Sequence, residues 1–417
     1  MKQTFALLLA CALSFGLLAG CARTSAAKEL TASKLSANPS NSEEVNEALA
    51  SFGLELLQKT REAEKKSVFV SPLSVTLALS MTANGADGNT LTQFQEVLGG
   101  GTDLIELNGA CVQLIQDYQN LKGSTKCSIA NSLWVDPDGQ IRGEFVGKCR
   151  GVFDAQVFQA ELSDSRIVDD LNGWVSEHTN KMIPQIVSEP FPEETACLLV
   201  NALYLKNQWQ KEFDPLCTHQ MDFHHAGGPD SQPDYLQHFD TSLSYLQGEG
   251  AQGVVLPYDD GRLAFFTLLP DLYPDSPGLG TWLASLEGGD LSWLIGNRTE
   301  AKFLHFAMPK FTAEWKGNLE EILPELGLTD AFVRGTANFS KMGDNEYGYY
   351  ISQVIHAAKI EVNEKGAEAA AATVVAAPAG AAEPPPPEGI TLVLDRPFLY
   401  GIVDLDTNVP LFLGTYE

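Results

Sequence analysis

The sequence predicts an α+β fold in one large domain, and three observations carry this prediction. Val45, Leu49, Phe52 and Leu56 share one face of a helical pattern. Residues 198–206 are apolar almost throughout, which is typical of a strand buried on both faces. Further strand-like runs continue to the C-terminus without a repeat or a second domain boundary, and 417 residues suffice to bury a large core.

The composition narrows the classes of function. A formal charge of −27 argues against nucleic acid and anionic membranes as electrostatic partners. The chain has no G-x-S-x-G, H-E-x-x-H, P-loop or helix-opening G-x-G-x-x-G motif, so we expect no enzyme activity and no cofactor. His219, His224, His225 and His238 match no metal-ligand spacing and are interpreted as surface histidines, with no metal site.

The N-terminus reads as an export signal. Residues 5–18 form an apolar run that is too short to span a bilayer, and the Leu-Ala-Gly-Cys sequence that ends at Cys21 resembles a bacterial lipobox. Residues 1–21 are therefore predicted to be a lipoprotein signal with Cys21 lipidated; the alternative is a plain secretory signal with an incidental cysteine. Residues 22–40 are predicted to be a flexible tether of about 25 Å mean reach. We expect an exported protein, lipid-anchored at a bacterial cell surface or at the periplasmic face of a membrane.

Cysteine usage does not indicate a disulfide framework. Of seven cysteines, Cys11 leaves with the signal and Cys21 would carry lipid. An odd number without metal-type spacing remains, so buried free thiols are expected, with one optional pair left open. The five remaining cysteines are Cys111, Cys127, Cys149, Cys197 and Cys217.

The regular elements follow from local signals. A helix is predicted to begin at Asn41, and Ser71 is predicted to cap a helix with Pro72 in its first turn, ending at residues 84–88. Pro309 is expected to mark a sheet edge or a bend. Further helices are predicted at residues 104–121, 168–179 and 320–327, and strands at 128–135, 253–258, 263–269, 303–311 and 349–361.

Residues 361–387 form a small-residue run that ends in four prolines. Its composition alone favours a linker. The strand-like tail that follows is too short to be a domain, so we interpret the run as a long loop that leaves a domain and returns to it. Its odd positions 367–377 and even positions 368–376 form the two faces of a possible strand. The odd face is small or β-branched throughout and could lie inside a sheet, up to Pro378.

Several motifs then carry a family resemblance. Residues 362–373 resemble the inhibitory form of the hinge in the reactive-centre loop of serpins. Residues 200–213 resemble the family's VNA-x-Y-F-K-G-x-W-x-x-x-F signature. Residues 330–340 resemble its DAF and ADFS segments. These motifs occur in serpin order from Asn41 to Tyr416, so the chain is identified as a member of that family. The resemblance implies a single domain over residues 41–417. It also implies a large central mixed sheet, additional sheets, surrounding helices and an exposed reactive-centre loop at about residues 364–395.

The resemblance also implies roles for matching positions. Ser71, Ser74, Asn201 and His356 match the shutter beneath the strands that must part, and Trp209 matches the breach where insertion begins; His356 and Trp209 could equally be core residues. The hinge comprises Glu364, Lys365, Gly366, Ala367, Glu368, Ala369, Ala370, Ala371 and Ala372. Ala367 stands where most inhibitory members have Thr or Ser.

The implied activity is irreversible inhibition of a serine protease, with cysteine proteases as a second class. The protease forms a covalent acyl-enzyme at the loop, and the cut loop inserts into the central sheet. Counting from the hinge places the reactive bond between Gly380 and Ala381, whereas counting back from Arg396 places it near Pro386. Small residues there favour elastase-like or subtilisin-like proteases. The alternative is a non-inhibitory, substrate-type serpin that acts as a surface binding or structural protein. A monomer is expected in either case.

Overall fold

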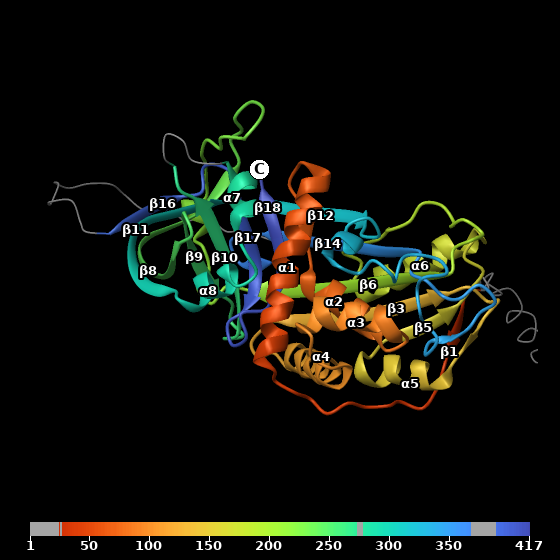
Figure 1. Cartoon of the computed structure of the whole chain (residues 1–417). Coiled ribbons are helices and arrows are strands. Elements are labelled where there is room, and N and C mark those ends of the chain that lie inside the picture. Colours follow the sequence, from red (N-terminus) through yellow and green to blue (C-terminus); the bar gives the residue numbers. More distant parts are fainter. Residues whose placement is uncertain (1–24, 26, 273–277, 368–388) are drawn as a thin grey trace, which may run out of the picture.

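The structure is a computed structural model that describes residues 25, 27–272, 278–367 and 389–417 (Figure 1). The described α-helices are α1 (Glu43–Glu64), α2 (Pro72–Ala83), α3 (Gly88–Gly99), α4 (Leu104–Gln119), α5 (Gly143–Val152), α6 (Arg166–His178), α7 (Leu279–Ser285) and α8 (Asp290–Gly296). Two 3₁₀ turns, η1 (Pro215–Cys217) and η2 (Leu323–Leu326), complete the helical elements of these residues. In this part of the chain no helix is both long enough and apolar enough to cross a membrane.

A seven-stranded mixed sheet forms the centre of the described fold. The β3–β5 and β6–β14 pairs are parallel and the other pairs are antiparallel. In spatial order its strands are β1 (Lys28–Leu30), β5 (Gln156–Gln159), β3 (Lys126–Val135), β6 (Cys197–Gln208), β15 (Gly366–Ala367), β14 (Gln353–Val362) and β12 (Phe311–Asn318).

A second sheet of nine strands lies beside the first in the described residues (Figure 1). Its order is β16 (Ile390–Val393), β11 (Thr299–Pro309), β8 (Asp234–Gly248), β9 (Ala251–Pro257), β10 (Leu263–Pro270), β17 (Phe398–Asp404), β18 (Pro410–Tyr416) and β2 (Phe69–Val70), with β7 (His219–Gln220) paired to β8. A small sheet pairs β4 (Gln140–Ile141) with β13 (Gly343–Asp344). The α+β class, the mixed central sheet and the additional sheets are thus confirmed.

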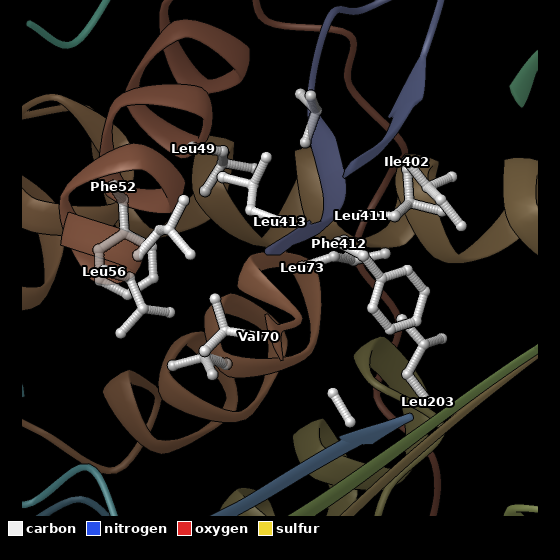
Figure 2. Close-up of a cluster of buried hydrophobic side chains, with 14 of the residues drawn as sticks. Leu49, Phe52, Leu56, Val70, Leu73, Leu203, Ile402, Leu411, Phe412 and Leu413 are labelled. Carbon is white, nitrogen blue, oxygen red and sulfur yellow. The ribbon is translucent and has the colours of Figure 1, made fainter. Parts of the chain in front are cut away.

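Two apolar clusters hold these layers together. The main cluster joins α1, α2, the nine-stranded sheet and one face of β6. Figure 2 shows Phe52 of α1, Leu73 of α2, Leu203 of β6 and Phe412 of β18 within it. A second cluster lies on the opposite face of β6, where α6 covers the sheet with Leu171 and other apolar side chains. Strand β6 is therefore buried on both faces, as its apolar run predicts.

The ends of several helices can be compared with the ends predicted from the sequence. Ser71 caps α2 as predicted, because its Oγ accepts a hydrogen bond from the Ser74 N–H at 3.3 Å. The first helix was predicted one residue too early: Ser42 is its cap, accepting from the Val45 N–H at 3.4 Å. The helix predicted at residues 320–327 is reduced to the short 3₁₀ turn η2. Pro309 ends β11, and the chain passes at residue 310 into β12 of the other sheet.

The prediction of a flexible tether over residues 22–40 was wrong for its later part. Strand β1 adds to the edge of the central sheet, with Lys28 opposite Gln159 of β5. Beyond it the Leu35 N–H donates to the Gly147 carbonyl at 2.9 Å, and the Ser40 N–H donates to the Gly109 carbonyl at 3.0 Å. We call residues 27–40 the N-terminal strap. Several of their backbone groups bond to neighbouring elements, so the segment is attached to the domain although its composition is polar.

Candidate functional site

The candidate site is the place where β6 and β14 separate. These strands pair directly from Gln353 opposite Leu198 to Ala357 opposite Ala202. Beyond that point β15 lies between them, with Gly366 opposite Gln208 and Ala367 opposite Asn207. The same Ala367 pairs with Val362 of β14. Gly366 and Ala367 of the predicted hinge therefore already occupy the position of an additional central strand.

A tight turn at Asn363 returns the chain into the sheet. The Asn363 Oδ1 accepts hydrogen bonds from the N–H groups of Lys365 at 3.0 Å and Gly366 at 3.3 Å. The Asn363 N–H in turn donates to the Gly366 carbonyl at 3.1 Å. An asparagine side chain stabilises such a turn because it supplies the acceptor that the reversed backbone needs. Asn363 lies in the stretch 362–373 that resembles the hinge, but the hinge residues assigned from sequence began at Glu364, so its role in the turn was not predicted.

Gly366 is required by the close approach of the backbone. Its φ is +150°, and a Cβ added there would lie 2.1 Å from the Asn207 carbonyl oxygen. Any larger residue would have to displace the end of β6, so a glycine is needed at this position. Asn207 stands where the family signature has glycine. Its side chain is fully buried, and neither its Oδ1 nor its Nδ2 has a hydrogen-bond partner among the described residues.

Glu364 fastens the turn to two other elements. Its carboxylate accepts from Lys310 Nζ at 2.9 Å and from Thr218 Oγ1 at 3.1 Å. Burial of the carboxyl opposes its ionisation, but the hydrogen bonds and the charge of Lys310 outweigh that effect and lower the pKa of Glu364. The ionised form is thus the one that holds the hinge in place.

Trp209, which matches the breach position of the family, lies directly behind the hinge. Its indole Nε1 donates to the Asn363 carbonyl at 2.8 Å, and its backbone N–H donates to the Lys365 carbonyl at 2.9 Å. Its ring is 3% exposed and stacks on Tyr258 with centroids 4.9 Å apart. Trp209 is therefore both a core residue and the anchor of the turn.

The predicted shutter residues come together below the hinge. His356 Nε2 accepts a hydrogen bond from the Ser71 N–H at 3.0 Å, and Ser71 Oγ donates to the Leu411 carbonyl at 2.8 Å. Asn201 lies opposite His356 in the β6–β14 ladder and donates to Asn131 of β3. Ser74 joins the group through its N–H, which donates to Ser71 Oγ. The four residues thus link α2, β6 and β14 at one point.

This shutter is incompletely satisfied. Ser74 Oγ, Asn201 Oδ1 and His356 Nδ1 are buried and have no hydrogen-bond partner among the described residues. Burial lowers the pKa of His356 to about 4, so the ring is neutral at pH 7. Buried polar groups without partners cost free energy, about 1–3 kcal/mol each in proteins. Within the described residues, three polar atoms of the shutter are therefore left without a hydrogen-bond partner.

Some of the remaining residues predicted from the sequence lie in the described part of the chain and others do not. Glu368, Ala369, Ala370, Ala371, Ala372, the bond between Gly380 and Ala381, and Cys21 lie outside the described residues. The five described cysteines are free, and none of the described His, Cys, Asp and Glu side chains gather in a group of three that could hold a metal ion. His238 is buried rather than exposed, because its ring stacks on Phe213 with centroids 4.1 Å apart.

Comparison with known proteins decides the family. The family model described as serpin, serine protease inhibitor, matches residues 47–417. The chain belongs to the serpin family. It is 30% identical to serpin B6 of Macaca fascicularis, a match that covers 89% of this chain and 98% of the macaque protein. Serpins are generally inhibitors that act on target proteases rather than catalysts, although some members do not inhibit.

The chain can also be compared with a solved serpin in two conformations. The thermophilic serpin tengpin in its native state superposes with a TM-score of 0.83 at 31% identity, covering 93% of this chain and 98% of tengpin. Tengpin in its latent state gives a TM-score of 0.76 at 30% identity. The described residues of this serpin are thus more similar to the native form.

Proposed function

We propose that this serpin is a suicide-substrate inhibitor of serine proteases, and that its loop inserts in the register that β15 begins. The observation that carries the proposal is the pairing of Gly366 with Gln208 and of Ala367 with both Asn207 and Val362. A strand that starts between two others in an antiparallel register continues in that register. Residues 368–371 would meet the facing edges of both strands, and residues 372–376 would replace the direct β6–β14 pairs.

Continuing this register places Thr373 opposite both Asn201 and His356. The two ladders agree, because Asn201 and His356 already oppose each other in the β6–β14 pair. Thr373 would bring a hydroxyl that both donates and accepts into the group with unpartnered atoms. Insertion would thus separate the shutter strands and supply a polar partner at the same position.

The same register assigns each face of the loop to an environment. Ala369, Ala371, Thr373, Val375 and Ala377 would share the face of Leu203 and Val354, which belongs to the main cluster. The even positions would share the opposite face, which α6 covers. Apart from Glu368, the side chains on both faces are small or β-branched and fit without displacing the existing core.

Pro378 falls beyond the end of β6 in this register. Ala377 would oppose Cys197, the first residue of β6, so the proline lies where no ladder partner is needed. The loop can therefore insert over its full small-residue length. The bond between Gly380 and Ala381 follows shortly afterwards, and its small residues suit elastase-like or subtilisin-like proteases; cysteine proteases are the second class.

We further propose that the protein is an exported monomer anchored by a lipid at Cys21. With residues 27–40 bound to the domain, residues 22–27 leave a connection of at most about 20 Å when fully extended. Lys28 of β1 pairs with Gln159 of β5, Gln159 pairs with Val135 of β3, and Val135 pairs with Cys197, the first residue of β6. The hinge pairs with the opposite end of β6, at Asn207 and Gln208. Figure 1 shows β1 and β16 at opposite ends of the molecule. The anchor would hold the reactive loop away from the membrane.

Denaturing gels test the inhibitory function. The chain from residue 22 is mixed with an elastase-type and a subtilisin-type protease, and a band at the summed mass that resists SDS is the expected result. Mass spectrometry of the released C-terminal peptide locates the cleaved bond. Ala367→Arg should abolish the band while cleavage continues, because a long charged side chain cannot follow Gly366 into the sheet. Complete cleavage of the unmodified chain without such a band, across a broad protease panel, would establish the substrate-type alternative instead.

A further inference from the structure

A small groove lies next to the hinge, between β8, β9 and the segment that follows β6. Its volume is about 200 Å³. Drug-sized ligands occupy sites of roughly 300–1,000 Å³, so this groove fits only a smaller molecule. The described hinge residues 364–367 and the four shutter residues do not line it. The groove is therefore distinct from the place where β15 enters the central sheet.

Apolar side chains form most of the groove. They come from the segment after β6 and from the two strands, and all except a half-buried proline are buried. They are Trp209, Phe213, Leu243, Val255, Leu256 and Pro257. Such a wall favours contact with an apolar group of a ligand over contact with water.

Two opposite charges lie beside these apolar walls. Lys211 and Glu300 are the charged residues of the described lining, because burial and, to a lesser degree, the charge of Lys211 lower the pKa of His238 to about 4 and keep its ring neutral at pH 7. Lys211 Nζ donates to Thr241 Oγ1 at 2.6 Å, and Glu300 Oε1 accepts from Ser244 Oγ at 2.7 Å. Each charge is thus oriented by a neutral hydroxyl group. The ammonium keeps two donors and the carboxylate keeps its second oxygen for a ligand.

The size, the apolar walls and the two charges together select the ligand class. A small molecule with one positive charge, one negative charge and an apolar group would match Glu300, Lys211 and the walls at once. A purely anionic or purely cationic molecule would meet one residue of its own sign. An α-amino acid with an apolar side chain has the required groups and no others. We propose that this groove binds such an amino acid, with its carboxylate on Lys211 and its ammonium on Glu300.

The same walls contain the residues that hold the hinge. Trp209 donates to the Asn363 carbonyl through Nε1 at 2.8 Å and to the Lys365 carbonyl through its backbone N–H at 2.9 Å. The Phe213 N–H donates to the Glu364 carbonyl at 2.8 Å. A ligand packed against Trp209 and Phe213 would restrict their motion and slow the opening of these bonds. The bound amino acid would therefore stabilise the hinge in its native position.

Calorimetry tests the ligand class. The probes added to the chain from residue 22 are L-leucine, L-isoleucine, L-valine, L-methionine and L-phenylalanine, and L-serine is the control for the apolar group. At least one apolar amino acid should bind at one site per chain. Analogues of the strongest binder that lack either charge should bind at least tenfold more weakly, as should serine. For leucine these analogues are isocaproate, which lacks the ammonium, and isopentylamine, which lacks the carboxylate.

Three substitutions test the geometry of the groove. Lys211→Met and Glu300→Gln should each weaken binding at least tenfold, and Ser242→Phe should block it by filling the groove. All three residues are exposed, so the variants should fold, and unchanged melting temperatures establish this. Lys148→Met and Glu144→Gln are the matched controls, because they remove the same charges from an ion pair of α5 outside the groove and should change nothing.

Hydrogen exchange tests the link to the hinge, and it needs no protease, so its outcome is independent of the inhibitory function. The Trp209 and Phe213 amides should exchange more slowly when the amino acid is bound, but not in the Ser242→Phe variant. Binding of none of the five apolar amino acids, equal binding of the analogues that lack one charge, or affinity that survives Ser242→Phe would overturn the proposed site. Exchange that the bound amino acid leaves unchanged would contradict the link to the hinge.

Discussion

His356 of β14 lies opposite Asn201 of β6, and each side chain leaves one buried polar atom without a hydrogen-bond partner in the described structure. The two residues lie within the direct β6–β14 pairing, next to its end at Ala357 and Ala202, and the proposed insertion of the loop would have to break this pairing. The same pair is the point that Thr373 reaches when the register of β15 is continued. The position in the sheet with unpartnered polar atoms is therefore the position where the loop would place the hydroxyl group of Thr373.

Thr373→Lys tests that position. The substitution should convert the protein from inhibitor to substrate, because a buried ammonium without a partner costs several kcal/mol and opposes insertion. The measure is the number of inhibitor molecules cleaved per protease molecule trapped. Glu388→Lys, on the distal side of the proposed bond, is the matched control and should leave that ratio near its original value. Equal trapping by Thr373→Lys would show that residue 373 does not enter the core.

His356 should make native stability fall in mild acid. Its pKa lies near 4 in the native protein against an ordinary value of 6.5, so only the unfolded chain gains a proton between these values. The contribution is fully present above pH 6.5 and is lost as the pH falls to about 4, a change of roughly 3 kcal/mol. Denaturant unfolding of the wild type and of His356→Gln across this range measures it. A stability difference between the two proteins that does not vary with pH would contradict the assignment.

Gly366→Ala should disturb the hinge. The added Cβ would meet the Asn207 carbonyl oxygen at 2.1 Å, so β15 must detach or the end of β6 must move, at a cost of about 1–3 kcal/mol. Hydrogen exchange of the Trp209 and Asn363 amides, which donate to the Lys365 and Gly366 carbonyls, should report the detachment. Gly278→Ala is the control, because Gly278 has open space and a φ of −63°. Unchanged exchange in Gly366→Ala would argue against a tightly packed hinge.

Because of the N-terminal strap, replacing a glycine of helix α5 by alanine should lower stability instead of raising it. Gly→Ala ordinarily stabilises a helix by roughly 1 kcal/mol. In α5, however, a Cβ at Gly151 would lie 2.1 Å from the Leu35 carbonyl oxygen, so Gly151→Ala should lower stability and expose the strap to proteases. Gly143→Ala in the same helix has open space and should not. Limited proteolysis followed by N-terminal sequencing distinguishes the two, and equal resistance of both variants would count against the strap packing.

Much of this arrangement was predictable from the sequence, and the remainder depended on contacts between distant segments. The apolar run of β6 and the small-residue loop predicted a sheet that accepts a strand, because burial on two faces leaves a local composition signal. Asn363 and the orphaned Asn207 were missed, since the role of each depends on a residue far away in the chain or on a backbone reversal. The strap was mistaken for a tether because its stabilising bonds use its backbone, which carries no side-chain signature.

Cross-linking across the inserted strand tests the register most directly. In the proposed register Ala371 opposes Ala358 of β14, whereas Ala370 points to the other face. After cleavage by the target protease, the variant with Ala358→Cys and Ala371→Cys should join through a short thiol-to-thiol reagent. The variant with Ala358→Cys and Ala370→Cys should not, and the parent chain measures the background of its own thiols. Cross-linking of both pairs alike, or of neither after cleavage, would contradict insertion in the register that β15 begins.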